Sequence, residues 1–368
     1  MIADTKQIPL MRPKLPDATQ LLPYLREIDA NRWYSNFGPL EQRLTGRFAA
    51  QFGVTGDHVV CLSNATTALS ISLAALTGDD GRYCLMPSFT FVATAQAALA
   101  AGLTPYFLDV DPATWRLDNS VVRDVIARLG SDVAAVTVVA PFGAPLDISP
   151  WDRLTEETGV PVVVDAAAGF DSVVPGVSPS VVSLHATKPL AAGEGGLVIS
   201  RDGDLIAEVK ARANFGFREQ RSAVGPGGNA KLGEYAAAVA LAALDQWAET
   251  RAGFARTTAA YVDAVNAVPA LQLSPGFGDD WVSATCNVIF DAPAGETAIA
   301  VLEQAGIEAR RWWNKGCHRE PLFSDGARDP LPVTEHLAER MVGLPFGSEL
   351  PAADIRRIVD ALTSISTA

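Results

Sequence analysis

Short apolar runs alternate with segments rich in alanine and leucine through much of the chain. Seven apolar runs predict β-strands, at residues 58–62, 82–86, 104–108, 133–140, 160–165, 180–184 and 197–200. Between the earlier runs, the pattern predicts helices at residues 66–76, 91–101, 119–129 and 148–158. Because these strands are apolar along their length and are separated by helices, we expect a mostly parallel sheet with helices on both faces.

The pattern changes from about residue 203 onward. Longer helical segments follow at residues 232–247 and 250–268, then strands near 284–290 and 306–310, and a last helix at 352–365. A chain of 368 residues has the length of about two domains. We therefore predict an α/β protein with a large domain at residues 1–248 and a smaller C-terminal domain at residues 249–368.

Composition and charge narrow the range of partners and locations. The net charge of −13 disfavours nucleic acid or an anionic membrane as the main partner. No apolar run reaches the roughly 18 residues of a membrane span, and the N-terminus lacks the apolar stretch of a signal peptide. The four cysteines show neither metal nor disulfide spacing, so we expect free thiols in a cytoplasmic protein without a metal site.

Residues that follow the strands are the first candidates for a ligand site, because parallel sheets bind ligands at the carboxyl ends of their strands. Ala65 and Thr66 open a helix whose free N–H groups suit a phosphate, although plain helix capping is the simpler explanation. Phe91, after the second strand, either covers a flat ring or packs in the core. Asp165 ends a very apolar strand, so it needs a cationic partner unless it caps a helix.

One chemistry unites these residues with Lys188, which follows the sixth predicted strand. Asp165 suits a protonated pyridine nitrogen, the helix start suits a phosphate, an aromatic ring suits the pyridine face, and Lys188 suits a Schiff base. This is the residue set of a pyridoxal phosphate site. Partial burial would lower the pKa of Lys188 and favour its neutral amine. The glycines after Lys188 are expected to form a tight turn that a side chain would crowd.

Over nearly its whole length, the chain resembles the DegT/DnrJ/EryC1/StrS family of sugar aminotransferases. The matching segments occur in the family's order: RWYSNFGPL, SNATTAL, MPSFTFVATAQAALAAGLTPYFLDVD, VVVDAAAGFDS, SLHATKPLAAGEGG, RANFGF, GGNAKLGEYAAAVALAAL and RRWWNKGCHREPLF. The lysine motif followed by Gly-Glu-Gly-Gly is the most specific of them. The resemblance implies the type I fold of pyridoxal phosphate-dependent transferases, in which a mostly parallel seven-stranded sheet flanked by helices forms the large domain and a smaller α+β domain follows.

The resemblance also implies a role for individual residues. Lys188 would be the Schiff-base lysine and proton shuttle, and Asp165 would hold the pyridine nitrogen. Phe91 would stack on the ring, whereas Asn229 would reach the phosphate of a neighbouring subunit, which implies a homodimer with shared sites. The remaining cofactor contacts would come from Ala65, Thr66 and Ser183. The residues expected on the substrate side are Trp33, Tyr34, His185, Lys231, Arg311, Trp312 and His318. Further candidate cations for a sugar diphosphate are Arg32, Arg212, Arg218 and Arg310.

Two positions depart from the family's usual pattern. Ala65 stands where glycine is common before the phosphate-binding threonine, and Ala168 stands where a glutamine often lies near the cofactor. A polar contact to the cofactor or sugar is therefore missing or supplied by another residue. Relatives with a histidine in place of the lysine are dehydratases, and Lys188 argues against that branch.

The resemblance implies an aminotransferase that moves an amino group from L-glutamate, through pyridoxamine phosphate, to a nucleotide-linked ketosugar. The preferred acceptor is a dTDP- or UDP-4-keto-6-deoxyhexose, as used for surface polysaccharides or glycosylated products. An aminotransferase acting on a 3-keto sugar is the alternative, and a non-catalytic regulatory protein on the same fold is a remote one. The sequence specifies neither the hexose, nor the nucleotide, nor the stereochemistry of the new amine.

Overall fold

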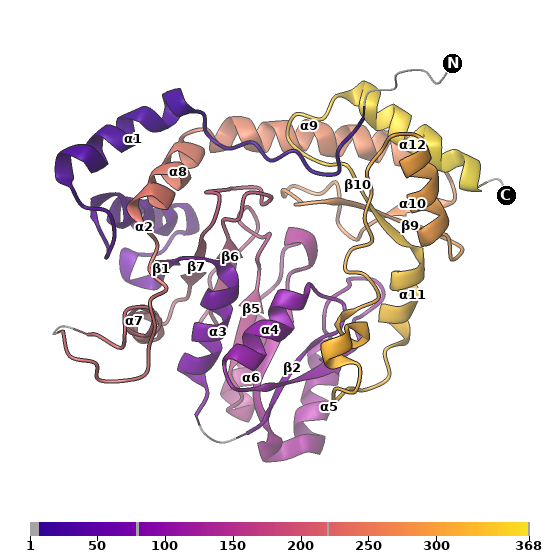
Figure 1. The fold of residues 1–368 in the computed structure, drawn as a ribbon. Helices are drawn as coiled ribbons and strands as arrows, with labels where there is room; N and C mark the ends of the chain where they lie inside the picture. Colours follow the sequence, from indigo (N-terminus) through magenta and orange to yellow (C-terminus); the bar gives the residue numbers. More distant parts are fainter. Residues whose placement is uncertain (1–6, 79–80, 219–220, 367–368) are drawn as a thin grey trace.

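The computed structural model describes residues 7–78, 81–218 and 221–366, and a seven-stranded sheet forms the centre of the larger part (Figure 1). The strand order is β1-β7-β6-β5-β4-β2-β3, and β7 is antiparallel to both of its neighbours while the other pairs are parallel. The predicted α/β class and the mostly parallel sheet are therefore confirmed. The strands are β1 Val59–Leu62, β2 Tyr83–Pro87, β3 Thr104–Leu108, β4 Val133–Val139, β5 Val162–Asp165, β6 Ser180–Ser183 and β7 Gly196–Ile199.

Helices cover both faces of this sheet, as the apolar strands require. Because successive residues of a strand point to opposite faces, Leu85 of β2 enters the core beneath α2, α5, α6 and α8. Its neighbours Cys84 and Met86 enter the core beneath α3, α4 and α7. The helices are α1 Ala18–Asn31, α2 Pro39–Phe52, α3 Ala65–Leu76, α4 Val92–Ala100, α5 Asn119–Leu129, α6 Ser149–Thr158, α7 Gly203–Arg212 and α8 Glu234–Asp245.

The C-terminal part of the chain forms a second, antiparallel sheet of order β10-β9-β8. Figure 1 shows α9 running along the top of the molecule from the α8 side toward α12. α9 begins at Trp247, beside the boundary predicted near residue 248, and the boundary itself stays a prediction. The elements are α9 Trp247–Asn266, β8 Leu271–Leu273, β9 Cys286–Phe290, α10 Gly295–Gln304, α11 Pro332–Arg340, β10 Met341–Leu344 and α12 Ala352–Ser366.

The strand predicted at residues 306–310 is wrong. Ile307 and Arg310 form only isolated bridges, the first with Ile8 and the second with Gly343. Residues 306–308 pair with the N-terminal segment instead of joining a sheet, because Ile8 N–H donates to Gly306 O at 2.9 Å and Glu308 N–H donates to Ile8 O at 2.9 Å. The N-terminal segment therefore lies against the C-terminal part of the chain.

Five short 3-10 turns complete the described elements: η1 Gly56–His58, η2 Gly130–Asp132, η3 Pro141–Gly143, η4 Cys317–Arg319 and η5 Pro321–Phe323. No helix in the part of the chain that the structure describes is both long and apolar enough to cross a bilayer. The same residues contain no group of three or more metal-ligating side chains arranged to hold an ion. The four cysteines are all buried as free thiols.

Candidate active site

A cavity of about 590 Å³ opens at the carboxyl ends of β1, β2, β4, β5 and β6. This volume lies within the usual range for small-molecule sites. Residues from the segments that connect the elements of the C-terminal part also line the cavity. The structure brings together these sequence-predicted residues in the cavity wall: Ala65, Thr66, Phe91, Asp165, Ser183, His185, Lys188 and Trp312.

The start of α3 provides free hydrogen-bond donors at one end of the cavity. Asn64 caps the helix by accepting a hydrogen bond from Thr67 N–H at 2.8 Å, which leaves the N–H groups of Ala65 and Thr66 without an acceptor among the described residues. The Ser183 hydroxyl accepts from His185 N–H at 3.2 Å and also lines the cavity. Free donors at a helix N-terminus are the donor set of a phosphate site. These residues therefore fit the phosphate of pyridoxal phosphate.

Asp165 ends β5 and is 6% exposed at the cavity wall. Its Oδ2 accepts a hydrogen bond from Thr94 Oγ1 at 2.7 Å, and its Oδ1 accepts one from Ala167 N–H at 3.1 Å. Burial raises the pKa of this carboxyl, and the two donors together with the charge of Lys188 oppose that rise. No described cation lies within ion-pair distance of Asp165, so a protonated ring nitrogen fits as the cationic partner.

Lys188 lies in the turn after β6 and lines the same cavity. Its backbone N–H donates to His185 O at 2.9 Å, and Ala186 N–H donates to Gly193 O at 2.9 Å, which closes the loop beneath it. Burial lowers the pKa of the Lys188 amine, and the nearby charge of Asp165 opposes this effect only in part. Within the described ranges, the amine makes no hydrogen bond or ion pair. A partly buried, partnerless amine with a lowered pKa suits covalent and acid–base chemistry.

Aromatic side chains also line the cavity. The rings of Phe142 and Trp313 stack with centroids 4.3 Å apart and an interplanar angle of 9°. The guanidinium of Arg310 lies 5.0 Å from the ring centroid of Trp312, and both residues line the cavity. Arg311, which the sequence favoured on the substrate side, instead donates to Glu296 Oε1 at 2.8 Å and to Ala338 O, and it lies outside the cavity wall.

Other predicted residues lie outside the cavity of a single chain. Trp33 and Tyr34 are exposed in the segment between α1 and α2, and Tyr34 stacks on Tyr235 at 6.4 Å. Lys231 Nζ donates to Asn229 Oδ1 at 2.7 Å on the surface before α8. Whether these side chains contact a ligand through a second subunit stays a prediction.

His318 is buried beneath the segment that joins β2 to α4. Its Nδ1 lies 2.7 Å from Ser88 Oγ, and its Nε2 lies 3.5 Å from Glu335 Oε1. It lines a separate hollow of about 380 Å³ instead of the main cavity. Its predicted place near the sugar is therefore not seen in one chain. Burial and the charge of Arg319 lower the pKa of its imidazole.

Several functional residues had not been singled out from the sequence. Thr90 and Phe142 line the cavity, and Thr94 binds Asp165 from the first turn of α4. The spacing of the two threonines in the segment SFTFVAT could have indicated that their side chains lie together, because residues four apart lie on the same side of a helix. No comparable signal identified Phe142, which depends on a left-handed backbone conformation at φ 55°.

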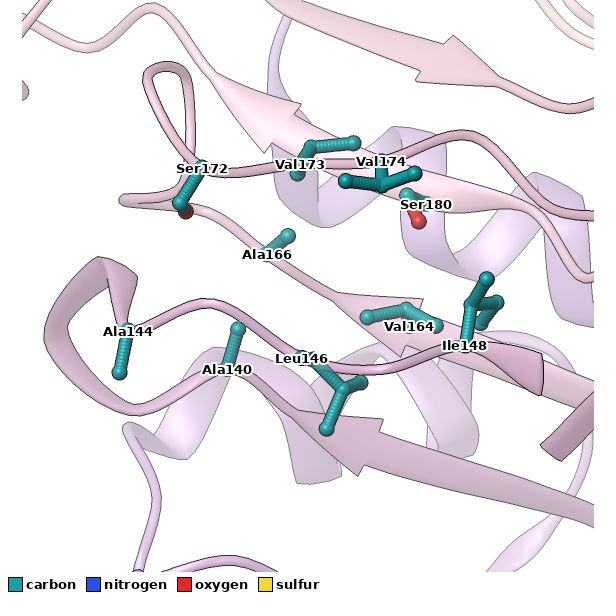
Figure 2. A pocket seen from close by; sticks show the side chains of 10 residues that line it. All are labelled: Ala140, Ala144, Leu146, Ile148, Val164, Ala166, Ser172, Val173, Val174 and Ser180. Carbon is teal, nitrogen blue, oxygen red and sulfur yellow. The ribbon is translucent and has the colours of Figure 1, made fainter. Parts of the chain in front are cut away.

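A second, much smaller cavity lies nearby and is not a ligand site. Figure 2 shows its wall, in which apolar side chains such as Leu146, Ile148 and Val164 dominate. Its volume is about 10 Å³, which is room for at most one water molecule. The hydroxyl of Ser172 donates to Gly143 O at 2.6 Å and is thereby satisfied within the chain.

The model of the DegT/DnrJ/EryC1/StrS aminotransferase family matches residues 17–363. Protein Rv3402c of Mycobacterium tuberculosis is 34% identical over 374 residues, which cover 97% of this chain and 89% of that protein. The dTDP-4-amino-4,6-dideoxy-D-glucose transaminase of Escherichia coli is 25% identical over 97% of this chain and 98% of its own. The UDP-N-acetyl-3-dehydro-alpha-D-glucosamine 3-aminotransferase of Acidithiobacillus ferrooxidans is 28% identical over 84% of this chain and 85% of its own.

Solved structures agree with this relationship. A putative PLP-dependent aminotransferase from Bacillus cereus superposes with a TM-score of 0.91 at 31% identity, covering 97% of this chain and all of that one. DesI, solved in the presence of its TDP-sugar product, superposes with a TM-score of 0.88 at 32% identity, covering 98% of this chain and 93% of that one. The expected type I fold, pyridoxal phosphate as cofactor and an aminotransferase activity are thereby confirmed. The chain belongs to the DegT/DnrJ/EryC1/StrS aminotransferase family.

Proposed function

We propose that the protein transfers an amino group from L-glutamate to a nucleotide-linked ketosugar, with a dTDP- or UDP-4-keto-6-deoxyhexose as the preferred acceptor. The observation that carries the proposal is the single cavity in which Lys188, Asp165 and the free N–H groups of α3 meet. The names of the Escherichia coli relative and of DesI's TDP-sugar product support a nucleotide-linked sugar. The Acidithiobacillus relative, named as a 3-aminotransferase, keeps amination at C3 as the second candidate.

The chain's own residues supply binding, orientation and proton transfer. Bound pyridoxal phosphate supplies a ring that withdraws electrons from the substrate carbon. The N–H groups of Ala65 and Thr66 would hold its phosphate, and the carboxylate of Asp165 would keep its ring nitrogen protonated. The Lys188 amine, whose pKa is lowered by burial, would accept the proton from Cα of glutamate and, in the second half of the reaction, would donate a proton to the sugar carbon that receives the amino group.

Arg310 is the residue we assign to the acceptor's diphosphate. Apart from Lys188 and His185, it is the basic side chain that the described residues place in the cavity wall. It is exposed at the cavity rim and makes no ion pair with a described acid, so its charge is available to an anion. A guanidinium stacked on an aromatic ring is held in one orientation before the phosphate arrives. Trp312, Trp313 and Phe142 then provide the surface against which the hexose packs.

A homodimer fits the surface around Asn229. The exposed aromatic side chain of Phe215 lies beside it, because Phe215 N–H donates to Gly228 O, and exposed apolar side chains are common at protein interfaces. Lys231 contacts both Asn229 and Phe215, because its Nζ donates a hydrogen bond to Asn229 Oδ1 and lies 4.6 Å from the Phe215 ring centroid. We propose that this face meets a second copy and that Asn229 reaches its phosphate site. Four reduced, buried thiols support the cytoplasm as the proposed location.

The deciding experiment offers the enzyme L-glutamate together with a panel of 4-keto and 3-keto nucleotide sugars, and identifies aminated products by mass spectrometry. We expect one 4-keto-6-deoxyhexose to be aminated. Replacing Arg310 by glutamine should raise the KM for the sugar nucleotide and leave the reaction with glutamate alone nearly unchanged. The matched control is Arg256→Gln, at an exposed position of α9. Amination of only 3-keto sugars would transfer the proposal to the second candidate, and no amination would overturn both.

A further inference from the structure

Two buried hydroxyl groups connect the cavity wall to Asp165. Thr90 Oγ1 lies 2.9 Å from Thr94 Oγ1, and Thr94 Oγ1 lies 2.7 Å from Asp165 Oδ2. Thr90 and Thr94 are 2% and 1% exposed, so water does not compete for these hydrogen bonds. Thr90 also lines the main cavity, whereas Thr94 lies behind it. The three side chains form one continuous chain of hydrogen bonds.

The direction of the chain follows from counting hydrogens. An ionised carboxylate only accepts hydrogen bonds, and a threonine hydroxyl has a single hydrogen to donate. The Thr94 hydroxyl donates its single hydrogen to Asp165. In the hydrogen bond between the two threonines, Thr90 must therefore be the donor and Thr94 the acceptor. The separation of 2.7 Å between Thr94 and Asp165 is typical of a hydrogen bond to a charged acceptor. Both hydroxyl groups are therefore polarised toward the ionised form of Asp165.

This arrangement counteracts what burial does to Asp165. Burial raises the pKa of the carboxyl, and the largest opposing influence is the hydrogen bond from Thr94, followed by Ala167 N–H and the charge of Lys188. Thr94 is the third residue of α4, so the partial positive charge of the helix N-terminus acts in the same sense. These groups come from α4, from the segment after β5 and from the loop after β6. Of the three, only the Thr94 hydroxyl can be removed by an isosteric substitution.

A distant loop fixes the segment that carries Thr90. Cys317 N–H donates to Ser88 O at 2.9 Å, and Cys317 Sγ lies 3.3 Å from Thr90 O. Ser88 Oγ in turn lies 2.7 Å from His318 Nδ1. The backbone at residues 88–90 is thus held on the side away from the cavity. The two hydroxyl groups keep their positions because both the loop and the first turn of α4 constrain them.

We propose that Thr94 is a positioning residue which, supported by the hydrogen bond from Thr90, keeps Asp165 ionised and turned toward the ring nitrogen of pyridoxal phosphate. The inference rests on the proposed role of Asp165 and is independent of which sugar is aminated. Thr94 acts through Asp165 and does not itself touch the cofactor. Replacing it by valine keeps its shape and removes the hydrogen bond, whereas replacing it by serine keeps the hydrogen bond and removes a methyl group.

The test compares Thr94→Val and Thr94→Ser with the wild-type protein. Each apoenzyme is titrated with pyridoxal phosphate, and each holoenzyme is titrated with pH while the cofactor's absorbance is followed. We expect Thr94→Val to bind the cofactor about ten- to hundredfold more weakly, since a hydrogen bond to a charged group is lost. The change in cofactor absorbance at acidic pH should move to higher pH in Thr94→Val, because Asp165 protonates more easily once it has lost this hydrogen-bond donor. Thr94→Ser keeps the donor, so it should return the cofactor affinity to within about threefold of wild type and the transition close to its wild-type pH.

The matched control is Thr257→Val, another buried threonine on a helix, whose hydroxyl donates to Gly347 O at 2.9 Å and not to Asp165. It should lose stability and keep both the cofactor affinity and the pH transition. Wild-type affinity and pH transition in Thr94→Val would overturn the proposal, as would a Thr94→Ser protein as impaired as the valine variant. These readouts need no sugar, so a failure to aminate any ketosugar would contradict the proposed function alone.

Discussion

Gly196 is the position where one added methyl group should disturb the phosphate site most directly. It begins β7, pairs with Leu62 of β1 on one side and Ser183 of β6 on the other, and is buried in the sheet. A Cβ at this position would lie 2.6 Å from Ala65 N, 2.7 Å from Asn64 C and 2.8 Å from Ala65 Cα. All three are backbone atoms, so no side-chain rotation relieves the contact.

The size of the effect follows from these distances. Ordinary van der Waals contact begins at 3.4 Å, so the start of α3 must move by about 0.8 Å from its place in the wild-type protein. Overpacking of this kind costs about 1–3 kcal/mol of stability. The same movement displaces the N–H groups of Ala65 and Thr66 from the phosphate. Loss of one hydrogen bond to a charged group makes cofactor binding about ten- to hundredfold weaker.

The assay for Gly196→Ala measures thermal unfolding of the apoenzyme and its affinity for pyridoxal phosphate. Gly46→Ala is the matched control. Gly46 is a solvent-exposed residue in the middle of α2, and no atom lies within 4 Å of a Cβ added there. Alanine there should raise stability by up to about 1 kcal/mol and leave the affinity unchanged. Gly196→Ala with wild-type stability and affinity would refute the reasoning. Reduced stability with wild-type affinity would place the phosphate away from α3.

Three further predictions concern the reacting groups and the assembly. Lys188→Ala should abolish turnover and still bind the cofactor without a covalent bond, which reductive trapping and mass spectrometry detect; unchanged turnover contradicts the role of Lys188. Asp165→Asn should fold and bind the cofactor with severely reduced turnover, because the ring nitrogen loses its anionic partner, and near-normal kcat would exclude that role. Lys188→Ala and Asn229→Ala homodimers, mixed and allowed to exchange subunits, should gain activity at low cofactor, because one site of the heterodimer then carries neither change. No gain after proven exchange would show that Asn229 does not serve the other subunit.

Strand positions in the large sheet were predictable because the apolar runs are short, continuous and bounded by turn residues. The direction of β7 was not inferred, although the sequence contained the reason. Only a glycine-rich loop without a helix joins Ser183 of β6 to Gly196 of β7. A parallel connection needs a crossover, usually an α-helix, whereas antiparallel neighbours need only such a loop. Loop composition therefore carries information about strand direction that the apolar pattern lacks.

Residues at strand ends were the predictable part of the site. Asp165 and Lys188 follow apolar strands, where an ionisable side chain has few structural explanations, and both line the cavity. Thr94 was less accessible to such an argument, because a threonine in the first turn of a helix is ordinary. Its proposed role depends on the tertiary structure, which brings its hydroxyl at the start of α4 to 2.7 Å from the carboxylate at the end of β5. Tertiary contacts of this kind leave no local pattern in the sequence.

The choice between Arg310 and Arg311 shows where sequence reasoning reaches its limit. Arg310 exchanges backbone hydrogen bonds with Gly343, its N–H donating to Gly343 O at 3.1 Å and its carbonyl accepting from Gly343 N–H at 2.7 Å. This pairing directs Arg310 to the cavity and Arg311 to Glu296, because neighbouring residues of an extended segment point to opposite sides.

A shift of one residue in this pairing would exchange the two arginines, and the letters RRWW would be equally compatible with either arrangement. What fixes the register is outside the motif. A Cβ at Gly343 would lie 2.2 Å from Trp312 Cδ1, so the indole can occupy its place in the cavity wall only opposite a glycine. The arginine that lines the cavity is therefore selected by a glycine of β10, which lies outside the motif that supplies both arginines.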